Sequence, residues 1–129
     1  MEHFQFPSSR GGLTRKFVCG LDIYLTVNTM PNGEPGEIFL KLGKQGSTVS
    51  GLMQAWAVTI SAALQRGVPW PELREKFMGA RFDPSDHKYS SLVDAVARNV
   101  DELIDELRAR HEHETGQLLF GFLDDVPGE

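Results

Sequence analysis

EIFLKLGKQGSTVSGLMQAWAVTISAALQRG (37–67) contains the change of pattern that decides the fold. Its first six residues alternate apolar and polar side chains, which is typical of a half-buried β-strand. After a glycine-rich turn, apolar residues recur at the three- and four-residue steps of an amphipathic helix, predicted over 49–66. Ser47 or Thr48 is suited to cap the start of this helix, and Gly67 follows its end. The predicted core stripe of the helix comprises Val49, Leu52, Met53, Trp56, Ile60 and Ala63 or Leu64.

The residues before this stretch predict a small antiparallel sheet. RKFVCG (15–20) and IYLTVN (23–28) have the composition and alternation of strands. Asn32-Gly33 is a strong turn signal between the second strand and 37–42, so the last two strands are expected to form a hairpin. Residues 1–13 are rich in Ser, Pro and Gly and are predicted to be a flexible arm.

Two further helices are predicted after the long one. Pro71 suits the first turn of a short helix, PELREKF, which Gly79 ends. Ser91 and Asp94 resemble a capping box that opens a third helix. That helix carries a short heptad stripe, which is also a candidate partner interface if the core does not cover it. The stripe consists of Val93, Val96, Val100, Leu103 and Leu107.

The predicted fold class is therefore α+β, with a small antiparallel sheet packed against about three helices. One domain is expected over 14–110, followed by an acidic tail or docking segment over 111–129. The third helix is expected to fade over 111–116. QLLFGF (117–122) is expected to be either a late strand or a docking segment.

Composition narrows the class of protein. The chain has 129 residues, 40% hydrophobic and 24% charged, which suits one globular domain. A net charge of −5 argues against a protein that coats nucleic acid by bulk charge. The single cysteine, Cys19, excludes an internal disulfide. Neither a signal-peptide pattern nor an apolar run of roughly 20 residues occurs, so a cytoplasmic location without membrane contact is expected.

The glycine-rich turn is the strongest candidate site. A helix start offers unpaired N–H groups and a positive dipole end, which favour an anion or a phosphate. The alternative is a capped strand-to-helix turn with no ligand, and both interpretations stay open. The candidate anion-binding residues are Lys44, Gly46, Ser47, Thr48 and Arg81.

The sequence predicts no catalytic residue, no metal site and no cofactor. His111 and His113 point apart if they lie on a helix, so they are expected to belong to a solvated helix end. Cys19 has no nearby histidine and is expected to be a structural thiol. No nucleophile-elbow motif occurs among the serines.

The central residues, 36–85, resemble a known family. They are similar to the TSCPD domain, the C-terminal accessory domain of adenosylcobalamin-dependent ribonucleotide reductases. The similarity covers about residues 14–100. Its motifs are Gly36-Glu37-Ile38-Phe39, Lys44 with Gly46-Ser47-Thr48, Ser61 with Leu64-Gln65, Gly67-Val68-Pro69, and Arg81-Phe82 with Pro84.

Three departures limit what the resemblance implies. These 129 residues do not include the catalytic barrel of the reductases. The cysteine of the TSCPD signature is replaced within Ser90-Ser91-Leu92-Val93-Asp94, so metal binding is not carried over. The residues after Val100 are particular to this chain.

The resemblance implies a non-catalytic interaction or regulatory module linked to deoxynucleotide metabolism. The partner expected on this basis is a protein, either a reductase or a second copy in a homodimer. The alternative function is a nucleotide- or nucleic-acid-binding module that holds a phosphate with the loop 43–48.

Overall fold

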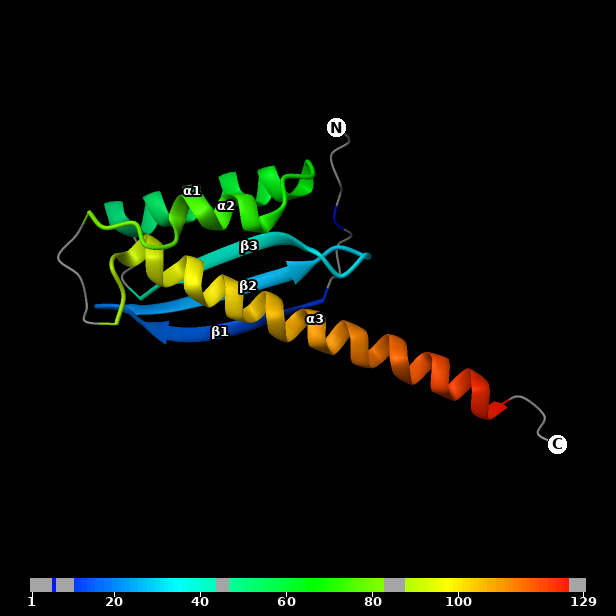
Figure 1. Cartoon of the computed structure of the whole chain (residues 1–129). Coiled ribbons are helices and arrows are strands. Elements are labelled where there is room, and N and C mark those ends of the chain that lie inside the picture. The colour runs from blue at the N-terminus through cyan, green and yellow to red at the C-terminus, as the bar shows by residue number, and fades with distance from the viewer. Residues whose placement is uncertain (1–5, 7–10, 44–46, 83–87, 126–129) are drawn as a thin grey trace.

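The computed structural model describes residues 6, 11–43, 47–82 and 88–125, with side chains described as far as 116. Three strands are followed by three helices (Figure 1). The strands are β1 (Gly12–Val18), β2 (Asp22–Thr29) and β3 (Pro35–Leu42). The helices are α1 (Thr48–Gln65), α2 (Trp70–Phe77) and α3 (Leu92–Asp125). This confirms the predicted α+β class.

The three strands form an antiparallel meander in the order β1-β2-β3. Gly33 has φ +85°, and its N–H donates to the Met30 carbonyl oxygen at 2.9 Å, so the predicted turn joins β2 to β3. Ile23, Leu25 and Val27 of the central strand are completely buried, as their alternation predicts.

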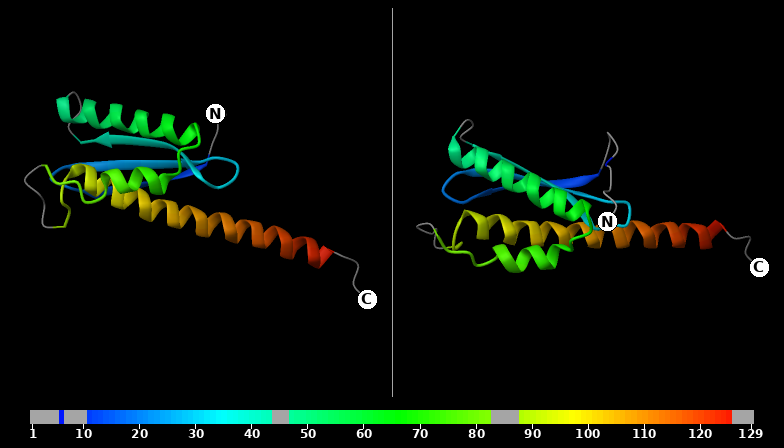
Figure 2. Two further views of the ribbon diagram at one scale, coloured as in Figure 1. Left: turned by 45° about the horizontal axis from the view of Figure 1, so that its top comes forward. Right: turned by 90° about the horizontal axis from the view of Figure 1, so that it is seen from above.

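The sheet has one covered face and one open face. Seen from above, α2 and α3 lie together on one side of the sheet, and α1 runs beside the edge strand β3 (Figure 2). Among the described residues, no helix covers the other side. We call this side the open face and define it by Thr14, Lys16, Tyr24, Thr26, Phe39 and Lys41.

Helix α1 lies along the free edge of β3 because Ser61 bonds the backbone of that strand. The Ser61 hydroxyl accepts from the Ile38 N–H at 2.9 Å and donates to the carbonyl oxygen of Ile38 (3.1 Å) or of Ala57 (2.9 Å). Gln65 Nε2 donates to the Gly36 carbonyl oxygen at 3.0 Å. An unpaired strand edge would otherwise invite another chain, so these bonds protect it.

We expect Ser61→Ala to destabilise the protein by about 1–3 kcal/mol, because the buried N–H of Ile38 would lose its acceptor. Thr59→Ala is a matched control, since the exposed Thr59 hydroxyl bonds only to Ala55 O within its own helix. Urea unfolding followed by circular dichroism would measure both changes. Equal effects of the two substitutions would contradict the bonding role given to Ser61.

The buried face of α1 differs from the prediction. Met53, Ile60 and Leu64 are buried as expected, but Val49 is 50% and Leu52 65% exposed. The buried positions also include Ser50, Ala57 and Ser61. These small side chains let α1 lie close enough to β3 for Ser61 to bond the strand backbone. With the small residues facing β3, the first part of the apolar stripe, Val49 and Leu52, lies at the solvent-facing side of the helix.

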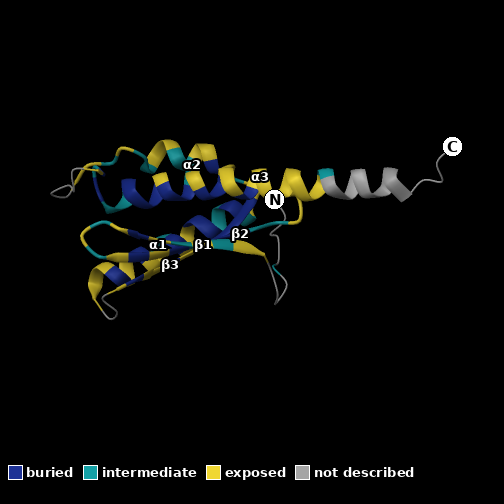
Figure 3. Ribbon diagram, turned by 90° about the horizontal axis from the view of Figure 1, so that it is seen from below, coloured by how far each residue is buried: buried dark blue, intermediate teal, exposed yellow. Residues whose placement is uncertain are grey.

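Helix α3 is longer than predicted. It continues through 111–116, where fading was expected, and through 117–122, so a late strand over QLLFGF is wrong. The buried half of α3 faces the sheet (Figure 3), and the helix then projects beyond the rest of the domain (Figure 1). On the N-terminal side, residues 12 and 13 belong to β1 rather than to a flexible arm.

Two ion-pair groups hold α3 against the sheet and the hairpin. Arg15 of β1 lies 2.6 Å from Glu102 and 2.6 Å from Glu106. Arg108 lies 3.1 Å from Glu34 in the β2–β3 turn. Because these pairs are partly exposed, each adds on the order of 1 kcal/mol or less, and apolar burial does most to hold the helix.

Candidate functional site

Ser47 acts as the N-cap of α1. Its Oγ accepts from the Ser50 N–H at 3.0 Å, and its carbonyl oxygen accepts from the Gly51 N–H at 3.0 Å. Thr48 is the first helical residue and is exposed. Lys44 and Gly46 lie outside the described residues. The predicted cap is therefore confirmed, whereas anion binding by this loop stays a prediction.

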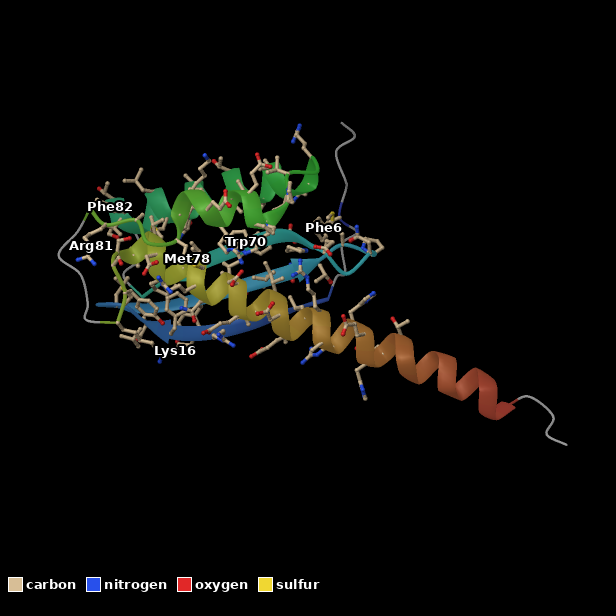
Figure 4. All side chains as sticks on the ribbon, viewed as in Figure 1. Phe6, Lys16, Trp70, Met78, Arg81 and Phe82 are labelled. Atoms are coloured by element: carbon tan, nitrogen blue, oxygen red, sulfur yellow. The ribbon has the colours of Figure 1, made fainter. Side chains whose placement is uncertain are left out.

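Arg81 lies at the same end of the molecule as this cap. Its neighbour Phe82 lines a groove together with Val49 and Leu52 of the first turns of α1. Arg81 and Phe82 are both exposed, and Figure 4 shows them side by side. The structure thus brings the predicted Arg81 to the region of Ser47 and Thr48.

The groove beside α1 is a site that sequence reasoning missed. It has a volume of about 380 Å³ and is formed where α1, the segment after α2 and the first residues of α3 meet. Phe82 is 64% exposed, which is comparable to Val49 and Leu52. The complete lining is Val49, Leu52, Met53, Trp56, Phe82, Leu92 and Val93.

The groove floor is held from below by aromatic packing. Trp56 meets Phe77 of α2 edge to face, with ring centroids 5.0 Å apart and an interplanar angle of 89°. Trp70, at the start of α2, donates from Nε1 to Asp101 of α3 at 3.0 Å, and Arg74 lies 3.2 Å from the same carboxylate. These contacts fix α2 between α1 and α3, so the groove has a firm base.

Asp94 fixes the third wall of the groove. Its side chain is 1% exposed and accepts from the Gly79 N–H at 2.6 Å and the Ser90 N–H at 2.9 Å. Arg98 Nε lies 2.9 Å from the same carboxylate. The carboxylate therefore ties the segment that leads to Phe82 to the start of α3.

The environment of Asp94 favours its ionised form. Burial alone would raise the pKa of this carboxyl, but the hydrogen bonds from Ser90, Gly79 and Arg98, together with the Arg98 charge, outweigh burial and lower the pKa.

The predicted cap of α3 is present as well, since the Asp94 N–H donates to Ser91 Oγ at 3.1 Å.

The heptad stripe of α3 is not an accessible interface. Val96, Val100 and Leu103 are at most 1% exposed, and Leu107 is 7% exposed. They pack in the core under the sheet, which corrects their assignment to a candidate partner surface. The heptad spacing failed to distinguish a sheet from a second helix as the packing partner. Val93 alone of the five stays half-buried, and it lines the groove.

Groups that could support metal chemistry are not gathered in the described part of the chain. There, no three side chains among His, Cys, Asp and Glu come together in a metal-binding arrangement. His111 and His113 are exposed on α3, and Cys19 is half-buried. None of the helices, as far as the structure describes them, combines the length and apolarity needed to cross a membrane.

Comparison with known proteins gives one consistent result. The family model of the TSCPD domain matches residues 6–107, so the similarity extends beyond the expected 14–100 at both ends, and 101–107 are not particular to this chain. A vitamin B12-dependent ribonucleotide reductase of Streptantibioticus cattleyicolor is 43% identical over 104 residues, covering 74% of this chain and 17% of the relative. A reductase of the same name from Rhodopirellula baltica is 38% identical over 102 residues, covering 73% of this chain and 10% of the relative.

A third reductase of that name, from Agrobacterium fabrum, is 36% identical over 85 residues, covering 65% of this chain and 7% of the relative. The chain thus spans less than a fifth of the length of these three relatives. No solved structure gives a significant match.

Proposed function

The chain belongs to the TSCPD domain family, and from that membership we propose that it is a non-catalytic interaction module that binds a vitamin B12-dependent ribonucleotide reductase. Its sequence corresponds to a minor part of such reductases, so a chain of this kind is suited to contact the remainder of one. Its role would then be to regulate or assemble an enzyme that makes deoxynucleotides.

The observation that carries this proposal is the apolar groove beside α1. Val49, Leu52 and Phe82 are each at least half exposed around one hollow. Exposed large apolar side chains that cluster are typical of a protein-binding surface, whereas scattered ones are not. Aromatic anchors such as Phe82 and Trp56 are the residue types that contribute most at such interfaces.

The acidic character of α3 agrees with a protein partner rather than bulk nucleic-acid coating. Asp101, Glu102, Asp105 and Glu106 lie in succession along it, and Arg15 and Arg74 neutralise only part of this charge. The groove itself is nearly free of charged side chains, so its contact with a partner would be driven by apolar burial.

We expect Leu52→Asp to weaken binding to a purified reductase, such as the Rhodopirellula baltica relative, by at least about tenfold. The substitution would place a charge in a desolvated contact. Biolayer interferometry with the reductase immobilised, both intact and without its own TSCPD domain, would measure the change.

Val58→Asp is the matched control, because Val58 is 66% exposed on the same helix but does not line the groove. It should bind like the unsubstituted chain. Absence of binding to either form of the reductase would overturn the proposal. So would a homodimer that Leu52→Asp dissociates, because the groove would then belong to a second copy.

A further inference from the structure

The open face of the sheet carries a second surface, independent of the groove. In the cross-strand register Lys16, Tyr24 and Lys41 form one row, and Thr14, Thr26 and Phe39 form the next. Tyr24 is 40% and Phe39 47% exposed, although both lie in the middle of strands. A hollow of about 370 Å³ lies between these rows.

The two aromatic rings are placed as neighbours. Tyr24 pairs with Lys41 and Phe39 pairs with Thr26, so the rings are diagonal partners on adjacent strands. Diagonal positions in a sheet lie about 7–8 Å apart, within reach of large side chains on the same face. The pair therefore presents two adjacent apolar surfaces to solvent.

The charge on this face is positive where the rings are. Lys16 Nζ lies 5.8 Å from the centre of the Tyr24 ring, and Lys41 adjoins Tyr24 on the other side. Lys16 points away from the helices (Figure 4). Asp22 lies 3.6 Å from Lys16, and Glu37 is buried and accepts a hydrogen bond from Asn28 at 2.9 Å. Glu37 is thus engaged by an uncharged side chain, whereas Asp22 pairs with Lys16 and would have to release it before Lys16 could hold a phosphate.

The acidic residues of α3 do not lie on this face. The acidic residues of α3 lie across the sheet, on its covered side, where Arg15 meets two of them. Salt reduces the range of their field to about 10 Å at 0.1 M. Locally, the open face keeps two ammonium groups beside two exposed rings.

We propose that the open face binds single-stranded DNA, with bases stacked on Tyr24 and Phe39 and phosphates held by Lys16 and Lys41. Proteins that bind single-stranded nucleic acid without sequence preference stack the bases on exposed aromatic side chains and hold the backbone with nearby cations. Stacking and phosphate contacts require no 2′-hydroxyl, so DNA suffices as the ligand. The proposal does not depend on reductase binding, because the groove residues take no part in it.

The other occupants of such a face fit less well. In a face-to-face homodimer, Lys16 and Lys41 of two copies would be brought together, and their repulsion opposes association. A protein that covered the face would have to desolvate two ammonium groups. A phosphate chain, by contrast, meets both lysines with the opposite charge.

The test is a fluorescence anisotropy titration with labelled oligo(dT) of about 12 nucleotides, a length within the usual span of one such platform. Tyr24→Thr and Phe39→Thr keep β propensity but remove the ring, and each should weaken binding about 5- to 150-fold. Lys16→Gln and Lys41→Gln should each reduce the slope of log K against log salt by about 0.7.

Matched controls separate this surface from the rest of the molecule. Tyr24→Phe keeps the ring and should bind almost unchanged. Phe82→Thr removes a ring at the groove that is more exposed than either Tyr24 or Phe39, and Lys76→Gln removes an exposed lysine of α2. Neither should alter DNA binding, because both lie outside the open face.

Several results would overturn the proposal. These are no binding of oligo(dT) at low salt, equal losses from Phe82→Thr and Phe39→Thr, or binding of oligo(U) alone. A homodimer or a reductase complex that Tyr24→Thr dissociates, without DNA binding, would assign the face to a protein instead. Failure here leaves the reductase-binding result unaffected, since that experiment uses Leu52 and Val58.

Discussion

Leu103→Ala is expected to destabilise the protein by about 2–5 kcal/mol. Leu103 is 1% exposed and belongs to the core between α3 and the sheet. Removing its branched end would leave a cavity that the surrounding strands cannot fill completely. Small domains have a free energy of unfolding of about 5–15 kcal/mol, so this loss would be a large part of the total. Urea unfolding followed by circular dichroism measures it.

The same substitution distinguishes a core residue from an interface residue. If the α3 stripe were a partner surface, Leu103→Ala would dissociate a complex and leave the protomer stable. Because the stripe is buried, we expect a lower urea midpoint with an unchanged m-value, and an unchanged oligomeric state by sedimentation velocity. Leu52→Ala is the control, since an exposed site should cost no more than about 0.5 kcal/mol. A stable Leu103→Ala protomer would contradict the packing described here.

The sheet could be predicted because its signals are local. Alternation over 23–28 and 37–42 gave the buried face, and Asn32-Gly33 gave the turn between them. A one-residue slip would have exposed Ile23, Leu25 and Val27 together, so the pattern strongly determines the register.

The orientation of α1 was predicted wrongly, because it depends on a partner that is distant in sequence. An amphipathic stripe predicts which residues are apolar, but Ser61 is buried by its bonds to Ile38, 23 residues away. The sequence does contain a signal for this orientation. Ser50 and Ala57 are small residues two helical turns apart, and such residues allow a helix to approach a neighbouring backbone closely. Reading them as a face would have placed Leu52 outside.

The groove and the open face were missed for a similar reason. Phe82 meets Val49 and Leu52 only after α2 has folded back against α3. The alternation over 23–28 and 37–42 places Tyr24 and Phe39 opposite the buried face, but it does not show that their rings are neighbours on adjacent strands. Their pairing with lysines follows from the register of three strands taken together.

Asp94→Ala is expected to destabilise the protein by about 2–4 kcal/mol: hydrogen bonds to a buried charged group are worth about 1.5–3 kcal/mol each and several are lost, but the cost of burying the carboxylate is removed with them. Gly79 and Ser90 would be left without the acceptor of their N–H groups, and Arg98 without its partner. The contact with Gly79 holds the segment that leads to Phe82. Without it, we expect Phe82 to be held less firmly in the wall of the groove. If the groove binds a reductase as proposed above, that binding should weaken in this variant even at temperatures where it remains folded.

The contribution of Asp94 should vanish in acid. The pKa of this carboxyl is lower in the folded protein than its ordinary value of 3.8, so its ionised form stabilises the fold fully above about pH 5. That stabilisation is lost as the pH falls through 3.8 and then through the lower folded value. Other carboxyls titrate there too, so the informative quantity is the difference in unfolding free energy between the unsubstituted chain and Asp94→Asn. The difference should be constant from pH 7 to about 5 and shrink below about 4. A difference that stays constant down to pH 3 would show that the charge of Asp94 does not stabilise the fold, and that only the shape of its side chain matters.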